Sequence, residues 1–188
     1  MRIKFFSFPH AGDIVTIRTW PKTIHRKLLY IRDFEVLDSG GGQLAAATSA
    51  WMIINAITHR IVPQKSLNLD LPAVSDSTGL DELLDRLSLL QNGDERLRVR
   101  AGYSDVDIVG HVNNSRYVEW ICDAFPIEMF REHKLDWLQI NYEHEILPGE
   151  EVSILVSPPE EDSGLWALEG RNRSNNTRAF ESVLHWRD

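Results

Sequence analysis

The chain has 188 residues, a formal net charge of −8, a hydrophobic share of 43% and a charged share of 26%. This composition supports a folded core, and the length allows one large domain or two small ones. The negative charge disfavours nucleic acid as a partner, because phosphate binding needs a basic face. No apolar run approaches the roughly 18 residues of a membrane span. The single cysteine, Cys122, excludes an internal disulfide and predicts a cytoplasmic protein.

The first 63 residues are typical of extended structure. Apolar and polar side chains alternate, which indicates half-buried strands, and strands are expected at 2–7, 14–20, 27–37 and 43–55. The segment DSGGG at 38–42 predicts a hairpin turn, since glycine tolerates positive φ. A phosphate-binding loop is the weaker interpretation, because no GK[ST] follows and no helix pattern begins there.

The pattern changes over 64–93, where prolines and a Ser/Asp-rich patch predict a linker. It contains one short amphipathic helix, LDELLDRLSLL, expected within 79–91. From residue 94 the expected order is a strand, an acidic turn, a helix and four further strands. These four are expected at 135–146, 151–157, 164–172 and 178–186. This order predicts an α+β fold in which an antiparallel sheet wraps a helix.

The most informative stretch is RVRAGYSDVDIVGHVNNSRYVEW, from Arg98 to Trp120. It places two aspartates, one histidine and two asparagines within Asp105 to Asn114, between an alternating strand and an amphipathic helix. Acids and an imidazole at the start of a helix are a suitable arrangement for hydrolytic chemistry.

The element order and the GHVNN turn resemble the hotdog fold, and the particular segments resemble the acyl-acyl carrier protein (acyl-ACP) thioesterase family. DVDIVGHVNNSRYVEW and NYEHEILPGEEV carry the resemblance in the second half, and GDIVTIRTW and ATSAWMIINAITHRIVP carry it in the first. The resemblance implies a partial N-terminal hotdog at 1–63, a linker at 64–93 and a complete C-terminal hotdog at 94–188.

The family usually has two whole hotdogs, whereas here the first would lack its opening strand and its central helix. A sheet without its helix leaves an apolar face open. We therefore expect a longer natural product, a second copy of the chain as a homodimer partner, or cover by the 79–91 helix.

The resemblance also implies site residues. Asp107, His111 and Glu145 are the implied catalytic groups, with Glu145 as the general base, because its apolar neighbours Ile146 and Leu147 would shield its carboxylate and make it a stronger base. The positions around the turn and the helix start are the implied substrate contacts: Val109, Gly110, Asn113 and Asn114. No metal, redox group or other cofactor is implied.

One site position departs from the family pattern, which has asparagine between the aspartate and the histidine. Here that position is Val109, which has no polar side-chain atom. Loss of one oxyanion donor costs about 10²–10³ in rate when nothing replaces it. A catalytically impaired module that binds acyl thioesters or a protein partner therefore stays open beside acyl-ACP hydrolysis, and so does an acyl-CoA thioesterase.

Each candidate also has a structural interpretation. Asp105 and Asp107 are suited to capping a turn, and Asn113 and Asn114 to capping the helix. His111 fits a turn histidine, and Glu145 an ordinary strand-end charge. A metal site formed by His111, Asp107, His144 and Glu145 lacks a tight ligand spacing. Cys122 lies in the apolar helix and is better interpreted as a small hydrophobe than as a nucleophile.

An acidic carrier and its phosphopantetheine phosphate would need a local basic patch on this chain. The candidate carrier-binding residues are Arg98, Arg100 and Arg116, with Arg96 and Arg131 nearby. A solvated strand edge and helix face explain the same arginines equally well. The function that the sequence favours is hydrolysis of acyl-ACP to free fatty acid and holo-ACP in fatty acid biosynthesis.

Overall fold

The fold is taken from a computed structural model of the chain. It describes residues 1–55, 57–58, 60–66, 77–81, 84, 86–87, 93–159 and 163–188. The chain forms two compact units, an N-terminal unit at 1–85 and a C-terminal unit at 86–188. Among the described residues, no helix has both the length and the apolar character needed to cross a membrane.

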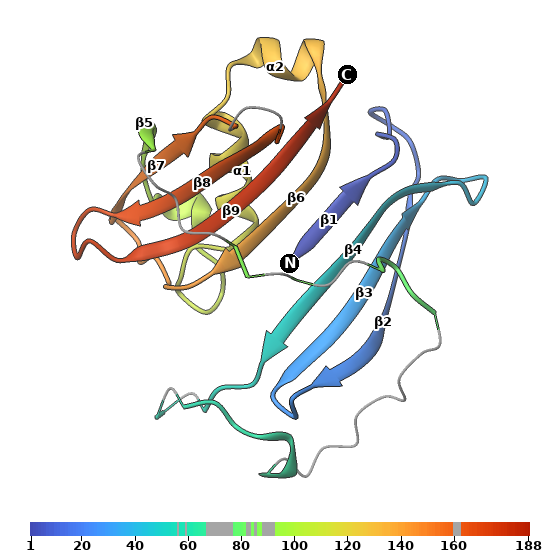
Figure 1. Cartoon of the computed structure of the whole chain (residues 1–188). Coiled ribbons are helices and arrows are strands. Elements are labelled where there is room, and N and C mark those ends of the chain that lie inside the picture. Colours follow the sequence, from blue (N-terminus) through green and yellow to red (C-terminus); the bar gives the residue numbers. More distant parts are fainter. Residues whose placement is uncertain are drawn as a thin grey trace. The chain divides into compact units, whose positions relative to one another are not determined.

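The N-terminal unit is an antiparallel sheet whose strands lie in the order β2-β3-β4-β1 (Figure 1). The strands are β1 (Arg2–Phe5), β2 (Thr16–His25), β3 (Leu29–Leu37) and β4 (Gln43–Met52), followed by a short 3-10 turn, η1 (Gln64–Ser66). The four predicted strands are confirmed, and so is the hairpin at 38–42. In that turn Asp38 Oδ1 accepts the backbone N–H groups of Gly40 and Gly42, both at 2.8 Å.

The strand ends differ from the prediction. β2 continues past Pro21 to His25, with a bulge between Pro21 and Thr23. Proline has no N–H for a strand ladder, and it is tolerated here because β2 lies at an edge of its sheet. Lys27, expected as the first residue of a strand, adopts a φ of 56° and forms the turn before β3 together with Arg26, at φ 52°.

A buried carboxylate lies at the centre of this sheet. The Asp33 side chain is 0% exposed; its Oδ1 accepts the Thr48 hydroxyl at 2.6 Å and its Oδ2 accepts the Gly79 N–H at 2.7 Å. Lys22 Nζ lies 3.2 Å from the same Oδ2 and also donates to the carbonyl of Leu80, a buried residue. Buried charges need such partners, because an unpaired buried charge is costly.

These contacts hold the segment 77–80 on the sheet, and Trp20 Nε1 adds a hydrogen bond to the Ser77 carbonyl at 2.7 Å. Gly79 lies so close that an added Cβ would be 3.1 Å from both Asp33 Cβ and the Phe34 carbonyl oxygen. Residues 77–80 are not helical. Most of the helix predicted within 79–91 falls outside the described residues.

The C-terminal unit has the predicted α+β plan, an antiparallel sheet in the order β6-β9-β8-β7-β5 with a helix against it (Figure 1). Its elements are β5 (Asp94–Arg100), a 3-10 turn η2 (Tyr103–Asp105), α1 (Asn114–Asp123), α2 (Ile127–Glu132), β6 (Lys134–Tyr142), β7 (Glu151–Ser157), β8 (Leu165–Asn172) and β9 (Arg178–Arg187). Two features were predicted wrongly: α2 was missed, and β6 ends at Tyr142 rather than at Ile146.

Helix α1 packs on one face of this sheet through aromatic side chains. The ring of Tyr117 meets the ring of Phe180 edge to face, with 5.5 Å between centroids. Phe180 lies against Gly170 on the neighbouring strand, where an added Cβ would be 2.1 Å from the ring. Glycine at 170 therefore leaves the space that lets Phe180 reach the helix.

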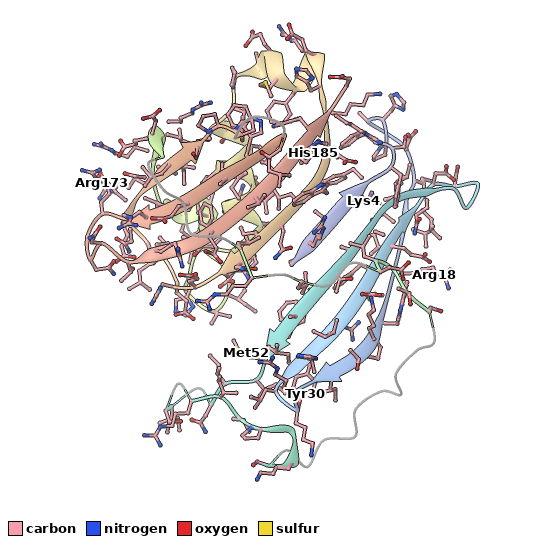
Figure 2. The ribbon with its side chains drawn as sticks, viewed as in Figure 1. Lys4, Arg18, Tyr30, Met52, Arg173 and His185 are labelled. Atoms are coloured by element: carbon pink, nitrogen blue, oxygen red, sulfur yellow. The ribbon has the colours of Figure 1, made fainter. Side chains whose placement is uncertain are left out.

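The other face of the sheet carries paired charges. Glu169 and Glu181 lie opposite each other on β8 and β9, and Arg178 Nη1 lies 3.8 Å and 3.4 Å from their carboxylates. The hydrogen bond from Arg178 to Glu143 raises the pKa of this guanidinium, so the charge that offsets the two carboxylates is permanent. Figure 2 shows Arg173 near the end of β8, where it bonds Glu95 and Ser153. This face therefore carries charged side chains, and most of these charges are paired with an opposite charge.

Candidate active site

The turn between β5 and α1 is a closed hairpin. Asp105 Oδ2 accepts the Gly102 N–H at 2.7 Å, and the Asp105 carbonyl accepts the Asn113 N–H at 2.8 Å. Val106 and Val112 form an antiparallel bridge across its base. The capping interpretation of Asp105 is confirmed, and its bonds place the start of α1 directly beside the turn.

Asp107 begins the tip of this hairpin. Its N–H donates to the His111 carbonyl at 3.0 Å, and its Oδ1 accepts the Val109 N–H at 2.8 Å. Gly110, at φ 93°, completes the turn in a conformation that disfavours other residues. One Asp107 oxygen is thus used in the turn, while the other has no hydrogen-bond donor among the described residues. The capping and the catalytic interpretations of Asp107 are compatible.

His111 and Glu145 lie in contact although 33 residues separate them in the chain. His111 Nε2 lies 3.2 Å from Glu145 Oε2. The contact is supported one residue further along each segment, where the Val112 N–H donates to the Ile146 carbonyl at 2.9 Å. A half-buried imidazole and an exposed carboxylate therefore lie in contact next to the start of α1.

The surroundings of Glu145 differ from the prediction. Glu145 lies in the loop after β6, not in a strand, and its side chain is 60% exposed. Ile146 is fully buried, so its side chain packs into the core and does not cover the carboxylate, and Leu147 is about half exposed. The apolar shielding expected for Glu145 is therefore absent, and its partner is the His111 ring.

Helix α1 begins next to this pair. Asn113 is the N-cap, and its side chain accepts the Ser115 N–H at 2.9 Å, which confirms the predicted cap. Asn114 is the first helical residue instead, and its carbonyl accepts the Tyr142 hydroxyl at 3.3 Å. The first turn of a helix presents N–H groups and the positive end of its dipole, which suit a developing oxyanion.

Other ionisable residues near the pair are bound elsewhere. His144 Nδ1 contacts the Arg178 carbonyl at 2.8 Å, and Glu143 forms a two-bond pair with Arg178. Within the described ranges, no three histidine, cysteine or acidic side chains lie close enough to share a metal ion.

The arginines predicted to bind a carrier each have a partner within the chain. Arg98 bonds Glu95 at 2.6 Å, and Arg100 Nε donates to the Gly149 carbonyl at 3.3 Å. Arg116 pairs with Glu119 and donates to the Ser104 carbonyl at 3.0 Å. The positive charges of Arg98 and Arg116 are therefore partly offset by neighbouring glutamates, and Arg100 is held by a backbone carbonyl.

Cys122 is half-buried in α1. Burial raises the pKa of its thiol, and the neighbouring charges of Asp123 and Glu119 act in the same direction. A thiol that keeps its proton is a poor nucleophile, in agreement with the apolar interpretation of this residue.

Sequence reasoning missed Tyr117 as a site residue. Its hydroxyl accepts the Ile146 N–H at 3.2 Å, directly beside Glu145. Tyr117 was assigned to the apolar face of the helix, and it does lie there. The only sequence signal was the hydroxyl itself, at a position where phenylalanine would pack equally well.

Comparison with known proteins shows the family of the chain. Residues 89–186, more than half of the chain, match the acyl-ACP thioesterase C-terminal domain. Residues 1–65 match the acyl-ACP thioesterase N-terminal domain. The chain belongs to the acyl-ACP thioesterase family.

Relatives and solved structures of the acyl-ACP thioesterase family match most of the chain. The chloroplastic oleoyl-acyl carrier protein thioesterase of Coriandrum sativum is 27% identical over 184 residues, which cover 92% of this chain and 50% of that one. The chloroplastic palmitoyl-acyl carrier protein thioesterase of Gossypium hirsutum is 30% identical over 156 residues, which cover 77% and 37%. The chain thus spans half or less of the length of these two relatives.

The crystal structure of an acyl-ACP thioesterase from Bacteroides thetaiotaomicron VPI-5482 matches 99% of this chain and 74% of that one, with a TM-score of 0.86 at 26% identity. The 12:0-ACP thioesterase from Umbellularia californica matches 99% and 72%, with a TM-score of 0.82 at 21% identity, which bears on the fold alone. The predicted hotdog architecture of the family is confirmed.

Proposed function

We propose that this chain hydrolyses acyl-ACP thioesters to free fatty acid and holo-ACP in fatty acid biosynthesis. The observation that carries the proposal is the 3.2 Å contact between His111 Nε2 and Glu145 Oε2 beside the start of α1. Family membership supports the substrate class, because the relatives matched are thioesterases named for acyl-ACP substrates.

In the proposed reaction, Glu145 accepts a proton from a water molecule, and the resulting hydroxide adds to the thioester carbonyl carbon. The proton passes from Glu145 to His111 across their contact, and His111 delivers it to the departing thiolate, so the products are a carboxylic acid and a thiol and both side chains return to their starting state. The carbonyl oxygen becomes an oxyanion near the first turn of α1. Asp107 fixes the hairpin that carries His111, and Val109, Gly110, Asn113 and Asn114 line the approach.

The carrier would meet this chain beside the same turn. We propose that Arg98, Arg100 and Arg116 exchange part of their internal pairing for contacts with the acidic carrier. We also propose a cytoplasmic setting, on the basis of the single Cys122, and a homodimer, in which a second copy of the chain would cover the apolar face of the sheet.

Purified protein should hydrolyse acyl-ACP, and it should hydrolyse the matching acyl-CoA with a lower kcat/KM. Both substrates carry the same phosphopantetheine thioester, so the difference reports on the carrier protein. The measurement is release of free thiol from each substrate at equal concentration. Comparable rates on both would favour an acyl-CoA thioesterase, and no release by folded protein would refute hydrolysis.

Val109 favours a second candidate, a catalytically impaired module that binds acyl thioesters or a protein partner. Its side chain is 70% exposed next to His111, and it offers no polar atom to a thioester. Its backbone N–H is already bound to Asp107. The exposed position has room for a longer polar side chain.

Val109→Asn should raise kcat for acyl-ACP by about 10²-fold, because it restores one donor at the turn and a lost oxyanion donor costs about 10²–10³. The matched control is Ile108→Asn, which adds the same amide at the neighbouring, fully exposed position. We expect no gain from the control. If both variants behave like the parent, the amide at 109 is not needed for this chemistry.

A further inference from the structure

Tyr117 lies directly beneath the loop that carries Glu145. It comes from the second turn of α1 and is 2% exposed. Its ring meets three other rings edge to face, those of Trp120 at 5.4 Å, Tyr142 at 5.7 Å and Phe180 at 5.5 Å. The ring is therefore fixed by packing from several sides, and its hydroxyl is held in one place.

That hydroxyl is connected to the catalytic pair through the backbone. It accepts the Ile146 N–H at 3.2 Å, and the carbonyl of the same Ile146 accepts the Val112 N–H at 2.9 Å. Glu145 directly precedes Ile146, and His111 directly precedes Val112. The backbone N–H of Ile146 is thus bonded to helix α1, and its carbonyl is bonded to the hairpin.

We propose that Tyr117 is a positioning residue whose hydroxyl holds the Glu145 loop so that the carboxylate meets His111. This inference rests on the proposed function of the His111–Glu145 pair. Glu145 is largely exposed, so its own side chain makes few contacts that would fix it. The Tyr117 bond restrains the loop from below, and the Val112 bond restrains it from the side of the hairpin.

The hydroxyl of Tyr117 stays protonated and uncharged at neutral pH. Burial, with smaller contributions from the negative charges of Glu145, Glu150 and Asp107, raises the pKa of Tyr117 to about 12, although the hydrogen bond from the Ile146 N–H acts in the opposite direction. A phenolate beside three carboxylates is unfavourable, so the proton stays on the oxygen below that pH. The acceptor of the Ile146 N–H is therefore a neutral hydroxyl at neutral pH.

Ring packing alone does not explain the hydroxyl. Phenylalanine at 117 would keep the three edge-to-face contacts and would leave the buried Ile146 N–H without an acceptor. Such an unmade bond to a buried backbone group costs about 1–3 kcal/mol, and the loop is expected to move to satisfy it. Movement of about 1 Å at a catalytic group is enough to lower a rate by about 10²-fold.

Tyr117→Phe tests the proposal, with Tyr142→Phe as the matched control. The control removes a hydroxyl from the neighbouring ring, whose bond goes to the Asn114 carbonyl and not to the Glu145 loop. We expect Tyr117→Phe to lower kcat for acyl-ACP about 10-fold to 10²-fold with little change in KM. Hydrogen exchange at the Ile146 amide should become faster in Tyr117→Phe only.

An unchanged kcat in Tyr117→Phe, alongside faster Ile146 exchange, would overturn the proposal and leave Tyr117 a structural residue. Equal losses of kcat in both variants would overturn it as well. If the parent protein shows no turnover, the proposed function fails, and crystal structures of the parent and Tyr117→Phe decide the inference. A separated His111–Glu145 pair in the variant would support it, and an unchanged 3.2 Å contact would overturn it.

Discussion

Glu145→Gln should lower kcat for acyl-ACP hydrolysis by about 10²–10⁴-fold, the usual contribution of a positioned general base. Glutamine has nearly the same shape and keeps a hydrogen-bonding oxygen toward His111, but it cannot accept a proton from water. KM should change little, because the carboxylate acts on water and not on the acyl chain or carrier. The measurement is steady-state thiol release under saturating acyl-ACP.

The control for this prediction is Glu143→Gln, two residues earlier in the same loop. Glu143 pairs with Arg178 rather than with His111. The control should therefore keep kcat within a few-fold of the parent value. Similar losses in the two variants would mean that loop charge matters and that Glu145 is not the base.

Asp33→Ala should lower the free energy of unfolding of the N-terminal unit by about 3–5 kcal/mol, the range for breaking a buried ion pair by removing one partner. The change leaves the Thr48 hydroxyl, the Gly79 N–H and Lys22 without their shared acceptor. The segment 77–80 would also lose its main attachment to the sheet. The measurement is urea unfolding followed by NMR through the amide signals of β3 and β4, which belong to this unit.

Glu35→Ala is the matched control on the same strand. Glu35 pairs with Arg18, a largely exposed side chain labelled in Figure 2, at 2.8 Å. The Arg18 end of this pair is 63% exposed and the Glu35 end 16%, so the pair is still in contact with solvent, and the control should lower the free energy of unfolding by clearly less than Asp33→Ala does. A loss of the same size in both variants would show that Asp33 does not act through its buried contacts.

Local patterns predicted most of the architecture. Alternation located β1 to β9 within a few residues, and the glycines at 40–42 marked the β3–β4 hairpin. The predicted cap at Asn113 located the start of α1. Helix α2 was missed because its six residues are too few to show a helical period and it follows Pro126 directly.

The site was predictable where the sequence carries distinctive polar residues. His111 and Glu145 were named from the family resemblance, and the structure places them in contact. The apolar shielding of Glu145 was predicted wrongly, because adjacent residues in an extended loop point to different sides. Asp33 and Tyr117 were missed because their roles depend on partners 46 and 29 residues away, which no local pattern reveals.

The strand β5 ends the C-terminal sheet, and it is DERLRVR in sequence, with charged side chains at all positions except Leu97 and Val99. An edge strand offers unpaired backbone groups on which another chain can add a strand, the first step toward aggregates. Charged side chains along an edge strand are one of the means by which proteins oppose such strand addition. The composition of β5 thus disfavours pairing with the same edge of another copy of the chain.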